Sequence, residues 1–459
     1  MPKFIQRSVI DASAAEVFRW HARSGALQRL LPPWERIAVV DRSGGIEDGA
    51  RTVLRISRGP LRLEWVAVHS GYEANRKFVD EQERGPFAAW RHVHRFTPQD
   101  ASSCILEDEI EYRLPLGALG AAIADRAVGR DLERTFRFRH RRTADDLRRH
   151  AESRGQPRLR VAISGASGTI GEALAAFLSS GGHDVLRLVR RAPRSAEEVE
   201  WDPATGTLDS EALEGLDAAV HLSGKSLASW PWTEAKKRTL WNSRIESTRT
   251  LASGLAHLRE PPRVLVSASA IGYYGDRGDE ELTERAEVGT GFLADLCQAW
   301  EAAARPAADA GIRVVNPRIG PVITAAGGML TKMLPVFKLG VGGVVGSGRQ
   351  YLSWIALDDL LGAILHILYQ DEIAGPVNVV SPGPVTNREF TRTLGRVLGR
   401  PTVLPLPTPA VKLIFGQLGR ETLLAGSRVR PAALEASGFR FGFSELSDTL
   451  RFTLGRSSE

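Results

Sequence analysis

The sequence has 459 residues, about two to three times the length of a typical domain, so a single small domain is excluded. Hydrophobic residues make up 43% of it, which excludes a disordered or fibrous chain. The 60 basic and 54 acidic residues leave a net charge of only +6. This surplus is too small and too dispersed to indicate a nucleic-acid partner.

Neither the cysteines nor the apolar runs point to secretion or to a membrane. Cys104 and Cys297 lie far apart and form no C-x-x-C pair, so a disulfide framework and a cysteine zinc site are excluded. The first residues contain no apolar run long enough for a signal peptide, and no later segment has the ~18 uninterrupted apolar residues of a membrane helix. We therefore expect a cytoplasmic protein with no membrane partner.

Residues 1–152 show the pattern of an α+β domain. Residues 61–69 and 90–96 alternate between apolar and polar positions, which predicts strands of a curved antiparallel sheet after a first strand at residues 4–10. Residues 118–152 then form a long amphipathic stretch, broken only by Gly129, which predicts a closing helix. A short polar break at residues 153–158 is suited to a domain linker.

A different pattern begins at residue 159. Short apolar strands alternate with helices, which predicts a doubly wound parallel sheet, a Rossmann fold, over residues 159–385. The predicted strands are 160–164, 184–190, 218–222, 263–269, 312–317 and 376–380. Residues 386–459, with a helix expected over 387–398, are predicted to form a small C-terminal substrate lobe on this domain.

A glycine-rich run follows the first strand of the predicted Rossmann domain. Gly165 permits a tight turn, Gly168 lets the backbone approach a pyrophosphate, and Gly171 allows the helix to pack closely on the strand. An ordinary structural glycine turn is the alternative, but the strand before and the helix after favour dinucleotide binding. The predicted cofactor contacts in this run are Gly165, Ser167, Gly168, Thr169, Ile170 and Gly171.

Two further segments are predicted to touch the dinucleotide. The second strand ends on Arg190 and Arg191 where an NAD enzyme would have a carboxylate, so we expect NADP rather than NAD. The alternative is that both arginines are merely exposed at the end of the strand. At the end of the predicted strand 218–222, the backbone of Leu222, Ser223 and Gly224 is predicted to run beside the cofactor.

Several short motifs carry a family resemblance over residues 158–456. This region resembles an atypical extended short-chain dehydrogenase/reductase of the epimerase-family, sugar-nucleotide-epimerase-like group. The ending from about Pro405 is similar to the C-terminal domain of unknown function found in that group. The motifs lie at residues 165–171, 201–203, 243–244, 269–276, 348–350 and 353–355.

The first domain resembles another family. Residues 85–87 (Gly-Pro-Phe) and 90–96 (Trp-Arg-His-Val-His-Arg-Phe) are similar to those of START-like, polyketide-cyclase-like helix-grip domains, also called SRPBCC domains. The resemblance implies a curved sheet wrapped around a long C-terminal helix, with an apolar cavity between them. A hydrophobic ligand is therefore expected in this domain.

The proton relay of the standard dehydrogenases is missing. Family members use a serine and a Tyr-x-x-x-Lys pair, but the helix at residues 291–301 contains neither tyrosine nor lysine. Ser269, Tyr273 and Tyr274 remain as candidate catalytic proton donors, and Arg318 as the residue that binds an anionic substrate group. Alternatively, the tyrosines are aromatic walls and Ser269 only bonds backbone.

No metal is predicted. His92 and His94 share one face of a strand, but no third ligand at suitable spacing is visible. The two rings are instead expected in a cavity wall or as a hydrogen-bonded pair.

The sequence thus predicts an NADP-dependent oxidoreductase acting on a small or hydrophobic substrate, and leaves the oligomeric state open. A non-catalytic NADP-binding sensor or scaffold is the first alternative. Sugar-nucleotide epimerisation is the second, and it needs a base that the sequence does not reveal.

Overall fold

A computed structural model describes residues 1–115, 118–228 and 230–456, with backbone only for 118–124. The chain divides into two compact units. Unit 1 comprises Met1–Gln156, Ala176–Gly182 and Leu454–Glu459, and unit 2 comprises Pro157–Ala175 and His183–Thr453. No described helix has both the length and the apolar character that crossing a membrane requires.

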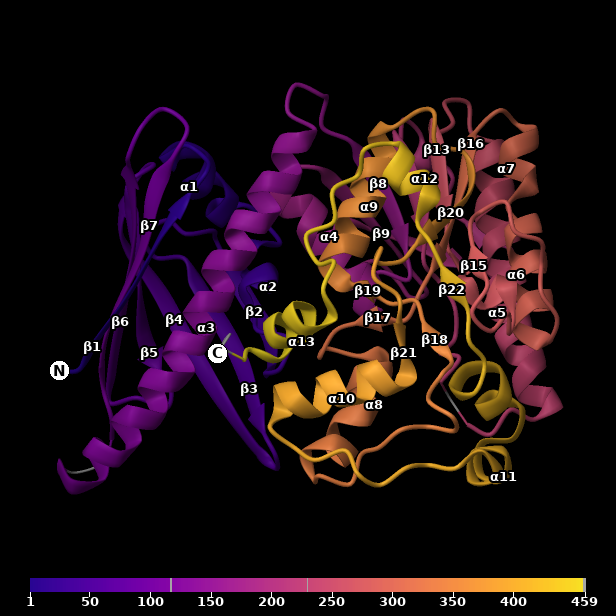
Figure 1. The fold of residues 1–459 in the computed structure, drawn as a ribbon. Helices are drawn as coiled ribbons and strands as arrows, with labels where there is room; N and C mark the ends of the chain where they lie inside the picture. Colours follow the sequence, from indigo (N-terminus) through magenta and orange to yellow (C-terminus); the bar gives the residue numbers. More distant parts are fainter. Residues whose placement is uncertain (116–117, 229, 457–459) are drawn as a thin grey trace. The chain divides into compact units, whose positions relative to one another are not determined.

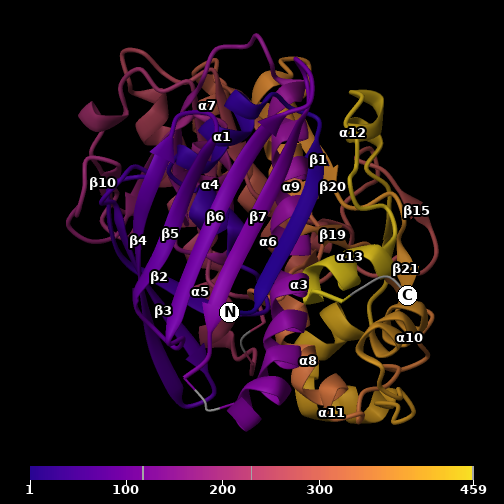
Figure 2. The same ribbon diagram turned by 90° about the vertical axis from the view of Figure 1, so that its left-hand side faces the viewer.

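Unit 1 is built on a seven-stranded antiparallel sheet in the order β1-β7-β6-β5-β4-β3-β2. Burial alternates along β7, as period-2 side-chain geometry requires of a sheet with one covered face. The covered side carries the long helix α3 (Ala118–Glu152), which continues through Gly129 and packs against β1 (Figure 2). The strands are β1 (Lys3–Ile10), β2 (Arg36–Ser43), β3 (Arg51–Arg58), β4 (Leu61–Glu73), β5 (Lys77–Arg84), β6 (Ala89–Pro98) and β7 (Cys104–Arg113).

Two short helices, α1 (Ala14–Ala22) and α2 (Ala26–Leu30), follow β1. Helix α1 begins with a capping box, in which Ser13 and Glu16 satisfy each other's backbone N–H groups. Aromatic rings fill the interior: Phe18 packs edge-on against Phe96 at 5.3 Å between ring centroids. The helix-grip architecture expected for this domain is confirmed.

Unit 2 contains the predicted doubly wound sheet, with α9 on one side and α5 to α7 on the other (Figure 1). Its parallel strands follow the order β10-β9-β8-β12-β13-β16, with β20 pairing to β16. From β8 the chain first adds strands on one side (β9, β10) and then on the other (β12, β13, β16), so the strand order reverses between β8 and β12. Open α/β sheets bind ligands at this point. The strands are β8 (Arg160–Ser164), β9 (Asp184–Val189), β10 (Glu198–Asp202), β12 (Ala218–His221), β13 (Val264–Ser267), β16 (Arg313–Ile319) and β20 (Gly375–Val379).

The predicted strand at 263–269 is divided in two. Strand β13 ends at Ser267, and the next amide, that of Ala268, bonds the carbonyl of His221. The chain then forms β14 (Ser269–Ala270), which pairs with β16 and brings Ser269 beside Arg318. The 3-10 helix η2 (Ile271–Tyr274) follows directly.

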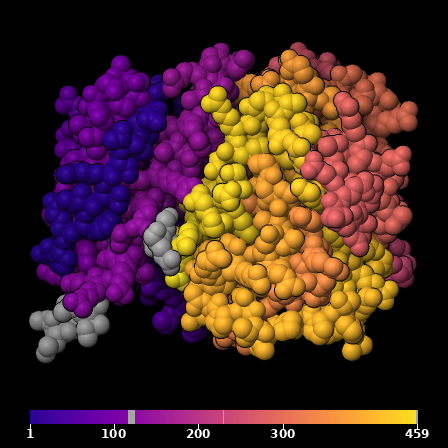
Figure 3. All heavy atoms as spheres, viewed as in Figure 1, coloured from indigo at the N-terminus to yellow at the C-terminus, as the bar shows by residue number. Residues whose placement is uncertain are grey.

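The remaining elements cover the sheet or build the lobe. The helices are α4 (Thr169–Gly181), α5 (Glu234–Ala256), α6 (Phe292–Ala302), α7 (Arg305–Asp309), α8 (Gly328–Lys338), α9 (Leu357–Tyr369), α10 (Asn387–Leu398), α11 (Thr408–Leu418), α12 (Ala432–Ala436) and α13 (Leu446–Leu454), with short turns η1 (Glu211–Leu213) and η3 (Gly419–Leu423). Short strands pair β10 with β11 (Thr207–Leu208), β15 (Glu281–Leu282) with β22 (Arg428–Val429), β17 (Val322–Ile323) with β19 (Ile355–Ala356), and β18 (Tyr351–Leu352) with β21 (Val385–Thr386). Residues 386–453, orange to yellow in Figure 3, form a continuous part of this unit's surface on the face that the figure shows.

Candidate functional site

The glycine-rich turn between β8 and α4 is closely packed against the neighbouring strand. Gly165 has φ +72°, and a Cβ on it would lie 2.8 Å from the carbonyl carbon of Leu222. A Cβ on Gly171 would lie 2.2 Å from the Gly165 carbonyl oxygen, so neither position accepts a side chain. The Gly168 amide closes the turn by donating to the same carbonyl at 2.9 Å. The first amides of α4 lack intrahelical partners and are available to an anion.

A buried histidine fixes the two loops that meet here. His221 Nδ1 lies 2.7 Å from Ser164 Oγ, and its Nε2 lies 3.2 Å from Ser247 Oγ. Burial, together with the nearby charge of Arg244, lowers the pKa of His221 to about 3, so the ring is neutral. The structure thus brings residues 165–171 together with residues 222–224, which start where β12 ends.

The arginines at the end of β9 differ from each other. Arg191 forms two hydrogen bonds with Glu198, at 2.8 and 2.6 Å, so its guanidinium is already engaged. Arg190 is exposed and has no ion-pair partner among the described residues. Of the two, Arg190 is therefore the more accessible to a phosphate group.

Helix α5 supports the loop after β12 through Ser243 and Arg244. The Lys225 amide donates to Ser243 Oγ at 3.3 Å, and Arg244 Nη2 donates to the Lys225 carbonyl at 3.0 Å. The Arg244 guanidinium is buried and stacks over Trp300 at 4.9 Å, and burial lowers its pKa to about 10. A Cβ on Gly224 would lie 3.2 Å from that guanidinium, so Gly224 gives the loop its close approach.

Ser269 and Arg318 meet at one carboxylate. Ser269 Oγ donates to Glu301 Oε1 at 2.7 Å. Arg318 donates to both oxygens of Glu301, at 2.8 and 2.9 Å. Burial alone would lower the pKa of Arg318, but the Glu301 carboxylate raises it above its ordinary value.

Tyr274 extends this network to β20. Arg318 Nη1 donates to Tyr274 Oη at 3.0 Å, and Tyr274 in turn donates to Asn378 Oδ1 at 2.6 Å. Burial raises the pKa of Tyr274, although Arg318 partly opposes the shift. Ser269, Tyr274 and Arg318 are each at most 3% exposed, so all three are engaged inside the protein.

Tyr273 occupies a different environment. It is only partly buried, and the Arg318 guanidinium lies 3.4 Å from its ring centroid. Its hydroxyl makes no hydrogen bond with another residue in the described part of the chain. Of the three tyrosine and serine hydroxyls predicted to act in catalysis, this is the one that remains available to a substrate.

Glu301 was not singled out from the sequence. It lies on α6, the helix expected to carry the Tyr-x-x-x-Lys pair, and no sequence signal marks it as the partner of Arg318. Cys297, one turn earlier, is buried, and burial together with Glu301 raises its pKa to about 12, so its thiol is protonated.

Two residues of the C-terminal segment bond elements of the candidate site. Glu421 accepts hydrogen bonds from the amides of Phe292 and Leu293, at 3.3 and 2.9 Å, and so caps α6. Asp276, two residues after η2, accepts one from the Gly426 amide at 3.0 Å. The C-terminal segment is therefore bonded beside both elements that carry Tyr273 and Glu301.

Comparison with known families identifies the parts of the chain. The NAD dependent epimerase/dehydratase family matches residues 161–380, and a domain of unknown function, DUF1731, matches residues 406–453. The polyketide cyclase / dehydrase and lipid transport family matches residues 10–138. An epimerase family protein of Mycobacterium bovis is 46% identical over 296 residues, covering 64% of this chain and 98% of that protein.

Two solved structures are also similar. A nucleoside-diphosphate sugar epimerase from Corynebacterium glutamicum is 32% identical with a TM-score of 0.81, covering 98% of this chain and 90% of that one. The human epimerase family protein SDR39U1, solved with NADPH, is 34% identical with a TM-score of 0.60, covering 64% of this chain and 99% of its own. The chain therefore belongs to the epimerase family proteins of the NAD dependent epimerase/dehydratase family, with a polyketide-cyclase-like unit before the Rossmann unit and a DUF1731 segment after it.

Proposed function

We propose that this chain is an NADP-dependent oxidoreductase that acts on a small or hydrophobic substrate beside η2. The observation that carries the proposal is the turn at Gly165, whose backbone packs directly on Leu222 after β12, so that α4 begins where the strand order of the sheet reverses. This arrangement suits a pyrophosphate. The residues assigned to it are Gly165, Ser167, Gly168, Thr169, Ile170, Gly171, Leu222, Ser223 and Gly224.

The choice of NADP rests on Arg190. Its exposed guanidinium suits a 2′-phosphate, whereas Arg191 would first have to leave Glu198. The human relative that was solved with NADPH supports the same choice. When bound, NADPH would supply the hydride for reduction of a carbonyl carbon.

The protein's own contribution would be a proton at the carbonyl oxygen. We assign this proton to the Tyr273 hydroxyl, which Arg318 holds in place by contact with the ring face. Glu301, Ser269 and Tyr274 would position Arg318 rather than meet the substrate, because their polar atoms are bonded to one another or to the guanidinium. An anionic group on the substrate would reach Arg318 only by displacing one of these partners.

Two measurements test the proposal. Titration of the purified protein with NADPH and NADH, followed by nucleotide fluorescence, is expected to show binding with preference for NADPH. A panel of aldehydes, ketones and enones is then expected to give at least one substrate that oxidises NADPH. With that substrate, Tyr273→Phe should lose turnover and keep NADPH binding. The control is Tyr369→Phe, which should keep both, because the native Tyr369 hydroxyl donates to the Pro157 carbonyl at an exposed position.

A non-catalytic NADP-binding sensor is the second candidate. It is favoured by the absence of the Tyr-x-x-x-Lys pair and by the closed network around Arg318, which leaves few free polar groups for catalysis. NADPH binding without turnover of any panel compound would favour it. The similar protein from Corynebacterium glutamicum is named a nucleoside-diphosphate sugar epimerase. If this chain catalysed such an epimerisation, the assay would show interconversion of nucleoside-diphosphate sugars without net consumption of NADPH.

A further inference from the structure

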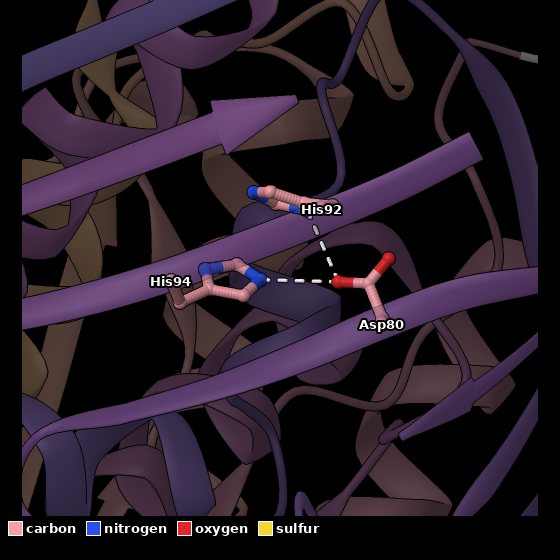
Figure 4. A group of neighbouring side chains, drawn as sticks. All are labelled: Asp80, His92 and His94. Carbon is pink, nitrogen blue, oxygen red and sulfur yellow. Dashed lines mark hydrogen bonds and ion pairs between the residues drawn. The ribbon is translucent and has the colours of Figure 1, made fainter. Parts of the chain in front are cut away.

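Unit 1 contains a group of two histidines and two aspartates that takes no part in the candidate site of unit 2. His92 and His94 are on β6, between Asp80 on β5 and Asp108 on β7. Asp80 pairs with His92 across one strand boundary, and Asp108 pairs with His94 across the other, so all four side chains lie on the covered face of the sheet. Figure 4 shows both rings directed at the Asp80 carboxylate.

Each imidazole joins the two carboxylates. His92 Nδ1 lies 3.0 Å from Asp80 Oδ1, and its Nε2 lies 2.8 Å from Asp108 Oδ1. His94 Nε2 lies 3.1 Å from Asp80 Oδ1, and its Nδ1 lies 2.6 Å from Asp108 Oδ1. All four ring nitrogens therefore face carboxylate oxygens.

The Asp108 side is already organised by hydrogen bonding. The other oxygen of Asp108 lies 2.6 Å from His140 Nε2, and His140 Nδ1 lies 2.8 Å from Ser8 Oγ. A carboxylate that accepts ring N–H groups fixes the tautomer and orientation of histidines, and metal-binding histidines commonly have such a partner. His92 makes this hydrogen bond through Nε2, so its Nδ1 presents a lone pair toward Asp80, and His94 turns its Nε2 to the same carboxylate oxygen.

Three electron-rich atoms then converge on one point: His92 Nδ1, His94 Nε2 and Asp80 Oδ1. They lie within 4.8 Å of one another. A single divalent cation between these atoms would bind all three at once. The two imidazole rings are close enough to share it, with ring centroids 3.8 Å apart.

The spacing of the three ligand atoms suits a transition-metal ion. A tetrahedral zinc ion at 2.0–2.1 Å from each ligand would need ligand atoms roughly 3.3 Å apart. The distances of 3.0 and 3.1 Å from Asp80 Oδ1 approach this value, so small side-chain shifts would suffice.

We propose that Asp80, His92 and His94 bind a divalent transition-metal ion of the zinc type, with Asp108, itself bonded to His140, orienting the His92 imidazole. Two imidazole nitrogens with one carboxylate are typical of zinc and non-haem iron sites, and do not suit calcium or magnesium, which prefer oxygen ligands throughout. Three protein ligands leave one coordination position open. The side chain of Asp80 is 18% exposed, against 3% for His92, so the ion and any fourth ligand would enter from the Asp80 side. Asp80, the ligand that sequence spacing did not reveal, comes from the adjacent strand.

The test uses the full chain without a polyhistidine tag. Protein dialysed against a chelator is titrated with Co²⁺, whose visible absorption reports coordination by nitrogen and oxygen ligands, and with Zn²⁺ by calorimetry. We expect one ion per chain and displacement of Co²⁺ by Zn²⁺. Asp80→Asn and His94→Gln should abolish the Co²⁺ spectrum, and Asp108→Asn should weaken binding about 10- to 100-fold.

The control is His257→Gln. His257 is an exposed histidine of unit 2, and its Nδ1 lies 2.6 Å from the Ser253 carbonyl oxygen. This variant should bind as the wild type does. The proposal is overturned if the folded wild-type chain gives no stoichiometric Co²⁺ spectrum, or if folded Asp80→Asn and His257→Gln bind the metal equally well. The wild-type spectrum alone decides the matter if the variants do not fold, with circular dichroism as the folding check.

Discussion

Replacing Glu301 with Gln removes the charge that compensates Arg318 while keeping the size of the side chain. In the native protein, Glu301 accepts two hydrogen bonds from Arg318 and one from Ser269. The Arg318 side chain is 3% exposed and that of Glu301 is 15% exposed, so solvent screens their interaction weakly. The variant would leave a buried guanidinium without its counter-ion.

Removing one partner of a buried ion pair costs about 3–5 kcal/mol. The Gln amide oxygen still accepts one hydrogen bond and Tyr274 stays in place, so we expect a loss near the lower end, about 3 kcal/mol in the free energy of unfolding. This corresponds to roughly a hundredfold change in the ratio of folded to unfolded molecules. Adding Arg318→Met removes the stranded charge as well, and should restore part of the loss.

The free energy of unfolding of unit 2 is measured by urea unfolding, with hydrogen exchange of peptides from α6 and β16 as the probe. These peptides report on unit 2 separately from unit 1. The matched control is Glu280→Gln, since Glu280 also accepts two hydrogen bonds from one arginine, Arg277, at 2.8 and 2.6 Å. Glu280 is 51% exposed, and exposed pairs contribute at most about 1 kcal/mol. Equal losses in the two variants would refute the view that the Glu301 pair is shielded from water.

Three further predictions concern the turn and its neighbours. Gly171→Ala should destabilise unit 2, because its Cβ would meet the Gly165 carbonyl oxygen at 2.2 Å. Gly168→Ala, whose Cβ would make a contact of 3.3 Å, should fold and mainly lose affinity for the nucleotide. Thermal unfolding and NADPH titration measure the two effects, and equal stability of the two variants would contradict the packing argument. His221 stays neutral in the folded state, with a pKa of about 3 against 6.5 when unfolded, so the free energy of unfolding falls as the pH drops below 6.5. Between pH 6 and 4 the wild type should lose about 2 kcal/mol more of this free energy than His221→Gln does. Urea denaturation at each pH measures it, and an equal loss in both proteins would contradict the prediction. Arg190→Ala should weaken NADPH binding about tenfold without changing NADH binding, as expected for the loss of one charge-assisted hydrogen bond. Arg191→Ala should weaken NADPH binding less, because Arg191 is bonded to Glu198. Equal effects of Arg190→Ala on the two nucleotides would count against a contact with the 2′-phosphate.

The glycine turn and the β/α alternation were predictable because each depends on a short, continuous stretch of chain. Gly165 and Gly168 lie between a strand and a helix, and Gly171 lies in the first turn of that helix, whose boundaries follow from local apolar patterning. The closing helix of unit 1 was likewise visible from its own periodicity. In such segments the backbone conformation and the spacing of residues fix the geometry, whatever the rest of the molecule does.

The partners of these elements were decided only by tertiary structure. Glu301 meets Arg318 because α6 packs on β14, which pairs with β16, and Asp80 meets His92 because of the register between β5 and β6. A shift of one residue in that register would turn Asp80 to the opposite face of the sheet. The chain itself determined which residue types could bind a nucleotide or a metal, whereas strand register and helix packing determined which of them lie together.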